Sequence, residues 1–289
     1  MTAQRPAGAG RSTIGRYGRG TSVLLVLPLA GLLLLGFLYP LAKLSSQSFF
    51  GPDFTLAYYM ELAAQPVYLK VFLSTFKIAF YCTVLALLIG YPLAFGLSRM
   101  KGWQQLLLLS CVLIPLWTSV LARSYAWVVL LQRRGVVNDM LVGSGIVSQP
   151  LRLLYTEAAV VVAMTHVLLP FMILPIYSSL RGIPRDYERA ALSLGASLWR
   201  ALFHVTLPLT LPGVFAGSVM VFIMALGFYV TPAIIGGSST LVLATLIGQQ
   251  MTVQLNWQMA GALSTVLLAV TLVLAVLFKR FLSFGRRMG

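Results

Sequence analysis

Long stretches without charged residues dominate this sequence and restrict how it can fold. Between Arg200 and Lys279 lie 78 consecutive residues without Asp, Glu, Lys or Arg. An apolar helix of about 20 residues is long enough to cross the hydrocarbon core of a bilayer. The chain is 59% hydrophobic and only 9% charged, whereas about a quarter of the residues of an average soluble domain are charged. The sequence therefore predicts an all-α integral membrane protein.

Shorter charge-free intervals each predict one further helix. Intervals of 21 to 23 residues end at Lys43, Arg99, Arg123 and Arg181. The 78-residue interval is too long for one span, and the polar residues within 236–257 divide it into two. We therefore predict six transmembrane helices in one membrane domain of residues 21–289, over 21–43, 72–98, 104–131, 156–180, 209–231 and 258–280.

Basic residues indicate how these helices are oriented. Residues 1–20 carry four arginines among small and polar residues, which predicts a disordered basic tail before an uncleaved first span. With the N-terminus in the cytoplasm, 14 of the 21 Lys and Arg residues fall on the cytoplasmic side. Both termini and the loop 181–208 are therefore expected there. The net charge of +15 is accounted for by these flanking residues, which disfavours nucleic-acid binding.

The loop 181–208 is rich in charged residues and contains residue types that commonly begin and end helices. Asp186 is a candidate helix N-cap, and Gly195 stands where a helix can end in a left-handed residue. Ser197 can cap a second short helix, and Pro208 marks the start of the next segment. The loop thus predicts two short helices joined at a glycine elbow. Small residues and one large aromatic residue suit it to a shallow groove on another protein: Ala190, Ala191, Ala196 and Trp199.

Motifs for chemistry are absent from the sequence. It has no Gly-x-x-x-x-Gly-Lys-Ser/Thr phosphate-binding loop, so it is not expected to hydrolyse ATP. Its two histidines, His166 and His204, have no acidic cluster or cysteine pair near them in sequence. Cys82 and Cys111 both lie in apolar runs. We therefore expect no enzymatic activity, no catalytic residue, no metal and no cofactor bound by this chain.

Residues 188–208 resemble the cytoplasmic Glu-Ala-Ala loop in the permease subunits of binding-protein-dependent ABC importers. That pattern is Glu-Ala-Ala, three residues, Gly, nine residues, Ile, one residue and Leu-Pro. Residues that match it in spacing are Ala190, Ala191, Gly195, Val205 in the Ile position, Leu207 and Pro208. Arg189 stands in the position of the glutamate, with Glu188 one residue earlier. Whether Glu188 replaces the missing carboxylate is left open.

Further motifs narrow the resemblance to the polyamine (spermidine/putrescine) branch, which also includes relatives for ferric iron and aminoethylphosphonate. They are Gly-Tyr-Pro-Leu-Ala at 90–94, Pro-Leu-Trp-Thr-Ser at 115–119, Arg-Ser-Tyr-Ala-Trp at 123–127, Leu-Pro-Phe-Met-Ile-Leu-Pro at 169–175 and Tyr-Val-Thr-Pro at 229–232. The resemblance implies a type I ABC importer permease (MetI-like) fold in a bacterial inner membrane. It also implies a second, related permease subunit, two ATPase subunits that hold ATP and Mg²⁺, and a periplasmic solute-binding protein.

By this resemblance, the elbow is a coupling helix that docks on an ATPase subunit. The residues assigned to it are Glu188, Arg189, Ala190, Ala191, Gly195, Ala196, Ser197, Trp199, Leu207 and Pro208. Two alternatives apply within this set: Trp199 can instead anchor the chain at the membrane interface, and the charged pair can be plain loop residues.

Aromatic residues and proline kinks indicate a translocation pathway. The candidates are Trp117, Arg123, Tyr125, Trp127, Pro170, Phe171, Phe228 and Tyr229. Kinks at Pro170 and Pro175 can equally serve interhelical packing, and Arg123 can reach toward the membrane surface. Polyamine is the expected substrate by resemblance alone. Few carboxylates lie in the spans, so the alternative is the same importer class with another substrate: an anionic phosphonate, for which Arg123 is suited, ferric iron or another small organic solute. A self-sufficient carrier or channel and a scaffold are the other classes considered.

Overall fold

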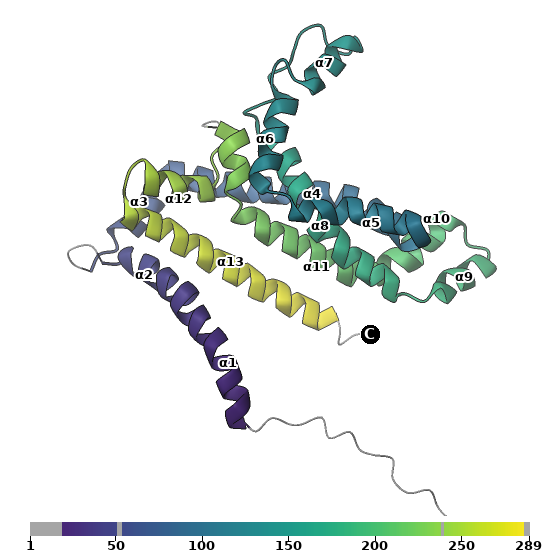
Figure 1. Cartoon of the computed structure of the whole chain (residues 1–289), viewed down its shortest axis with the longest axis horizontal. Helices are drawn as coiled ribbons and strands as arrows, with labels where there is room; N and C mark the ends of the chain where they lie inside the picture. Colours follow the sequence, from purple (N-terminus) through teal and green to yellow (C-terminus); the bar gives the residue numbers. More distant parts are fainter. Residues whose placement is uncertain (1–18, 51–53, 238–239, 286–289) are drawn as a thin grey trace, which may run out of the picture.

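The computed structural model describes residues 19–50, 54–237 and 240–285, and these are almost entirely helical (Figure 1). Their only strand-like pairing is an isolated bridge between Phe50 and Phe54. The elements are α1 (Arg19–Leu33), η1 (Leu34–Leu38), α2 (Tyr39–Gln47), α3 (Ala57–Ala64), α4 (Pro66–Arg99), α5 (Gly102–Trp117), α6 (Val120–Leu131), α7 (Val136–Gly143), α8 (Glu157–Gly182), α9 (Arg185–Ser193), α10 (Leu198–Ala201), η2 (Leu202–Thr206), α11 (Leu207–Leu226), η3 (Pro232–Gly236), α12 (Leu243–Thr252) and α13 (Trp257–Gly285), where η marks π-helical turns. The predicted tail lies outside the described residues up to residue 18, and Arg19 and Gly20 already belong to α1.

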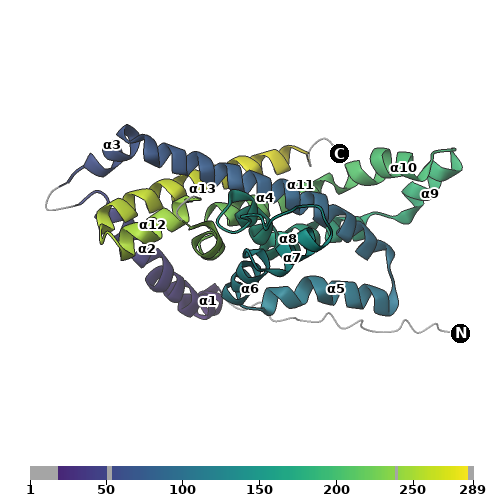
Figure 2. The same cartoon turned by 90° about the horizontal axis from the view of Figure 1, so that it is seen from above.

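Three long helices, α4, α8 and α11, form the centre of the bundle (Figures 1 and 2). α8 is the most buried of the candidate spans. Two glycines let α11 approach it closely: a Cβ added at Gly213 would lie 2.7 Å from the carbonyl oxygen of Pro175, and one at Gly217 would lie 3.0 Å from that of Met172. This Gly-x-x-x-Gly spacing allows membrane helices to pack backbone against backbone. Pro170 and Pro175 are both accommodated inside α8, which continues as one helix.

Five helical segments in the described part of the chain are long and apolar enough to span a membrane, or six if one bent pair counts as a single span. The bent pair is the predicted third span, 104–131, which is therefore not one helix. Its two parts, Gly102–Trp117 and Val120–Gly143, meet at 103°. Thr118 has an extended backbone, and its hydroxyl donates a hydrogen bond to the carbonyl oxygen of Pro115. A side chain that bonds to the local backbone in this way competes with helical hydrogen bonds.

The predicted fifth span, 209–231, also has different bounds in the structure. Helical backbone runs from Leu198 through α10, η2 and α11 to Leu226 without a break. The second short helix expected in the loop 181–208 is thus the first turn of this span. Pro208 does not separate the two because the amide of Leu207 bonds to the carbonyl of Leu202, closing a π-helical turn just before the proline. Proline is tolerated there in the first turn of α11.

The first span lies outside this centre. The apolar window of Val23–Gln47 has no buried residue, and α1 projects away from the bundle (Figure 1). α2 is held against α13, where a Cβ added at Gly261 would lie 2.6 Å from the carbonyl oxygen of Leu44. The exposed, apolar surface of α1 is suited to lipid or to another membrane subunit.

Candidate functional site

The loop between α8 and α11 begins with α9. Pro184 occupies the N-cap position without a side-chain hydrogen bond, so the prediction that Asp186 caps this helix is wrong. Pro184 has φ −60° and an extended ψ of 133°, and the helix starts directly after it at Arg185. Asp186 and Glu188 instead lie in the first turn. Their negative charges are favourable there because the N-terminus of a helix carries a partial positive charge.

A glycine elbow follows α9, as the sequence predicts. Gly195 has φ +87°, in the left-handed region that glycine adopts without a steric penalty. Its amide bonds to the carbonyl of Leu192 at 3.0 Å, and the amide of Ala196 bonds to that of Ala191 at 3.1 Å. These paired bonds close a Schellman motif. Ser197 then caps α10, accepting a hydrogen bond from the amide of Arg200 at 3.3 Å.

The tip of the elbow exposes large apolar side chains. Leu194, Leu198 and Trp199 are 89%, 69% and 71% exposed, and the Trp199 ring stacks on Phe203 at a centroid distance of 6.2 Å. Figures 1 and 2 show α9 and α10 projecting beyond the bundle on the side where α13 ends. An apolar patch that protrudes in this way is typical of a protein–protein or membrane contact. Ala190 and Ser197 are exposed on the same loop, Ala191 and Ala196 half-buried.

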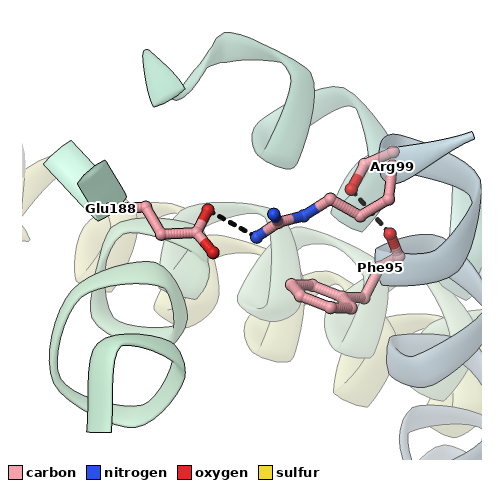
Figure 3. Close-up of polar contacts among 4 residues, drawn as sticks. Phe95, Arg99 and Glu188 are labelled. Atoms are coloured by element: carbon pink, nitrogen blue, oxygen red, sulfur yellow. Dashed lines mark hydrogen bonds and ion pairs between the residues drawn. The ribbon is translucent and has the colours of Figure 1, made fainter. Parts of the chain in front are cut away.

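Glu188 and Arg189 face different surroundings. The carboxylate of Glu188 accepts a hydrogen bond from Arg99 at the end of α4, with Nη2 and Oε2 2.6 Å apart (Figure 3). The Arg99 guanidinium lies over the ring of Phe95, 4.7 Å from its centroid. Arg189 points to solvent, and its nearest ionic partner is Asp186 at 3.6 Å, with both side chains more than 70% exposed. The carboxylate of Glu188, adjacent to the Glu position of the Glu-Ala-Ala pattern, is therefore directed toward the bundle, whereas that of Asp186 is exposed beside Arg189.

The candidate pathway residues differ widely in exposure. The Trp117 side chain is 90% exposed at the bend between α5 and α6, and Tyr125 and Tyr229 are also exposed. Pro170 is buried within α8. The remaining aromatic candidates, Trp127, Phe171 and Phe228, are half-buried against the core.

Polar contacts connect α6 to the bundle beside this bend. Trp127 donates from Nε1 to His166 Nδ1 of α8 at 3.3 Å, and Ser124 shares a buried hydrogen bond with Thr231 at 2.9 Å. Arg123 donates from Nη2 to the carbonyl of Thr118 at 3.3 Å. Among the residues that the structure describes, its Nε and Nη1 atoms are covered but have no hydrogen-bond partner. His166 lies on the exposed side of α8 and contacts Trp127.

Three features of this arrangement were missed by sequence reasoning. The Gly213-x-x-x-Gly217 spacing is visible in the sequence and could have been found. The side chain of Asn138 donates from Nδ2 to the backbone carbonyls of Gln132 and Leu151, and its Oδ1 accepts from the backbone amide of Leu151. No sequence motif marks this residue. The pair formed by Arg99 and Glu188 joins residues 89 positions apart, which no local pattern reveals.

Proteins of known function resemble this chain over most of its length. Spermidine/putrescine transport system permease protein PotB of Haemophilus influenzae is 37% identical over 226 residues, 77% of this chain and 79% of that protein. PotB of Escherichia coli is 32% identical over 233 residues, 81% and 84% of the two chains. Molybdenum transport system permease protein ModB of Mycobacterium bovis is 32% identical over 221 residues, 75% and 82% of the two chains.

Solved structures share the fold. A chain of the bacterial ABC transporter that imports the acidic polysaccharide alginate superposes with a TM-score of 0.69 at 18% identity, covering 90% of this chain and 96% of that one. A chain of the inward-facing methionine transporter MetNI gives a TM-score of 0.57 at 17% identity, covering 74% and 94%. Residues 83–285 match the family described as binding-protein-dependent transport system inner membrane component. The chain belongs to this family, as a multi-pass, all-α permease component of the ABC importer type.

Proposed function

We propose that this chain is one permease subunit of an ATP-driven polyamine importer in a bacterial inner membrane. The substrate assignment is supported by the PotB relative of Haemophilus influenzae, named for spermidine and putrescine, which is 37% identical and aligned over 77% of this chain. Protonated polyamines are cations that aromatic faces attract. A periplasmic binding protein delivers the substrate, and a second, related permease subunit completes the pathway.

The exposed elbow is the observation that carries the coupling role. Its apolar tip projects from the bundle with Leu194 and Trp199 uncovered, as a surface that docks into a groove of an ATPase subunit must be. ATP and Mg²⁺ belong to that ATPase. Because α10 continues through η2 into α11, a displacement of the elbow moves a helix packed on α8. Alternating access then needs two conformations whose balance the partners shift.

Reconstitution in proteoliposomes tests this function. The complete complex of two permeases, two ATPase subunits and binding protein is expected to accumulate radiolabelled spermidine or putrescine only with ATP. Liposomes that hold this chain alone are expected to show no flux. Flux through the chain alone would identify the protein as a carrier or channel. If deletion of its gene left cellular uptake of the substrate unchanged, the protein would be assigned a scaffold role instead.

An anionic substrate is the second candidate, and the nitrogen atoms of Arg123 that are unpaired within the described part of the chain favour it. The Arg123 guanidinium has two covered nitrogen atoms without a partner among the described residues, and ModB, a 32% identical relative, is named for molybdenum. Thermal-shift measurements on the cognate binding protein separate the candidates, since a ligand that binds the folded state raises its melting temperature. The panel contains spermidine, putrescine, molybdate, aminoethylphosphonate and ferric iron. We expect polyamines to stabilise the binding protein. If only an oxyanion stabilised it, the substrate would be assigned as that oxyanion and not as a polyamine.

A further inference from the structure

One ion pair ties the elbow to a central helix of the bundle. α9 packs mainly on η2 and α10, its own neighbours along the chain. Arg99 and Glu188, 2.6 Å apart, are different: they join α9 to α4, and no other described hydrogen bond or ion pair links these two helices (Figure 3). Within the described residues, this contact is therefore the direct polar link between α9 and α4.

Both charges of the pair occupy helix ends that favour them. Arg99 is the last residue of α4, where the chain turns extended at Met100, and a positive charge is favourable at a helix C-terminus. Glu188 lies in the first turn of α9, where a negative charge is favourable. The ring of Phe95 supports the guanidinium from one side. The pair is thus a preorganised contact between two helix termini, in contrast to the exposed pair of Arg189 and Asp186.

The pair forms part of the wall of a pocket. This pocket is lined by Ser98, Leu180, Ile183, Tyr187 and Thr206, together with Arg99 and Glu188. Side chains of α4, α8, α9 and η2 therefore surround an open space there, and α9 is not packed tightly onto α4. A helix held across a pocket by one charged contact can shift at lower cost than one embedded in a close-packed core, where every displacement loses contacts.

We propose that Arg99 and Glu188 form a latch through which the elbow moves α4, as a second link beside the continuous helix that leads into α11. This inference rests on the proposed coupling role of the elbow. α4 and α11 both pack on α8, so the two links act on helices that flank the same central helix. Arg99 is a positioning residue in this account. Glu188 serves the interior of the permease, and the ATPase-facing surface at this position carries Arg189 instead.

Charge-exchange variants in the complete reconstituted importer test the latch. Arg99→Gln and Glu188→Gln are each expected to lower polyamine uptake per ATP hydrolysed about fivefold, the low end of ordinary coupling between sites. The exchanged pair, Arg99→Glu with Glu188→Arg, restores the attraction but places each charge at the helix end that disfavours it, so it is expected to recover part of this ratio. Asp186→Asn, which removes an exposed carboxylate from the same helix outside the pocket lining, is the matched control and is expected to keep the wild-type ratio.

A distance measurement separates the latch from a general loss of structure. Nitroxide labels at Lys101 and Ser193, both exposed, report the separation of the end of α4 from α9. The distance distribution is expected to broaden in Arg99→Gln and to narrow again in the exchanged pair, with the thermal stability of the complex as a check on folding.

Different results overturn the latch and the proposed function. A defect in Glu188→Gln but not in Arg99→Gln would show that the carboxylate acts on the ATPase directly, and the latch would be rejected. Wild-type coupling in both single variants, or no recovery in the exchanged pair, would also reject it. Each of these outcomes requires a wild-type complex that transports with ATP. Failure of that wild-type complex to transport would reject the proposed function instead.

Discussion

Glu188 and Arg189 show how one step along a helix changes the surroundings of a charge. Successive residues of an α-helix point about 100° apart, so one of two neighbours can face the bundle while the other faces solvent. Glu188 reaches Arg99, and Arg189 remains exposed beside Asp186. In this chain the position of the pattern's glutamate is exposed and holds Arg189, while the carboxylate one residue earlier points to α4. The sequence places both residues in the loop, but only the tertiary arrangement shows which of them contacts α4.

Replacement of Gly195 is predicted to disturb the elbow through its backbone. A Cβ added there meets nothing within 4 Å, so the penalty in Gly195→Val comes from φ +87° and not from a clash. A left-handed conformation costs an L-residue about 1–2 kcal/mol, and β-branching adds to it. We expect the variant to lose the stimulation of ATP hydrolysis by binding protein. Gly195→Asn is the control, because asparagine tolerates this conformation, and wild-type stimulation in the valine variant would contradict the coupling role.

Elements of this fold differ in how far they follow from sequence. The charge-free intervals predict spans reliably, because an unpaired charge is costly in hydrocarbon. They measure length alone, and so the bend at Thr118 was not predicted, nor was the start of the fifth span at Leu198. The elbow could be predicted because its capping is local. The contact of α11 with α8 depends on which faces meet, and only its glycine spacing is visible beforehand.

Helix packing at this contact is predicted to be intolerant of a single methyl group. In Gly213→Ala the new Cβ would lie 2.4 Å from the Cβ of Ser179 and 2.7 Å from the carbonyl oxygen of Pro175. Backbone cannot yield as a flexible side chain does, and overpacking of this kind costs about 1–3 kcal/mol. The thermal midpoint of the purified protein is expected to fall. Gly96→Ala in α4, where nothing lies within 4 Å, serves as the control; equal midpoints in the two variants would refute this account.

Asn138 is predicted to hold the connection from α7 to α8. Its buried side chain makes three hydrogen bonds, two of them with the backbone of Leu151. In Asn138→Ala these part-buried backbone groups lose their partner, and a typical hydrogen bond contributes about 1 kcal/mol of net stability. Hydrogen–deuterium exchange of residues 144–153 is expected to accelerate. Ser144→Ala, which removes only a local, exposed bond to Leu141, should leave the exchange unchanged. Unaltered exchange in the asparagine variant would mean that the segment is held by other contacts.

The whole molecule has the elbow at one end of its bundle and α3 and α12 at the other (Figure 1). Basic residues predict that the end with the elbow is cytoplasmic. Class, fold and family follow from features spread along the chain, so they could be predicted from sequence. The exposure of the proposed pathway residues could not be predicted: Trp117 and Tyr125 are exposed while Pro170 is buried, and aromatic composition does not reveal which face of a helix is covered. The pathway itself stays a prediction.

Cysteine labelling tests the orientation of the molecule. With Cys82 and Cys111 replaced by alanine, Ser197→Cys is expected to react with a membrane-impermeant maleimide only after the inner membrane is opened. Ser144→Cys, in the connection after α7, is expected to react in spheroplasts without that step. The reverse pattern would place the elbow on the outer face and reject a cytoplasmic coupling role.

The π-helical turn at Leu202–Thr206 also determines the direction in which the exposed Trp199 points. Such a turn holds one residue more than an α-helical turn, and each residue rotates a helix by about 100°. A regular α-helical wheel extended from α11 back through Pro208 would therefore place Trp199 about 100° away from its position around the helix axis. The extra residue of the π-helical turn thus sets the direction in which Trp199 points around the helix axis. Deletion of one residue from this turn would rotate Trp199 about the axis, away from its present direction.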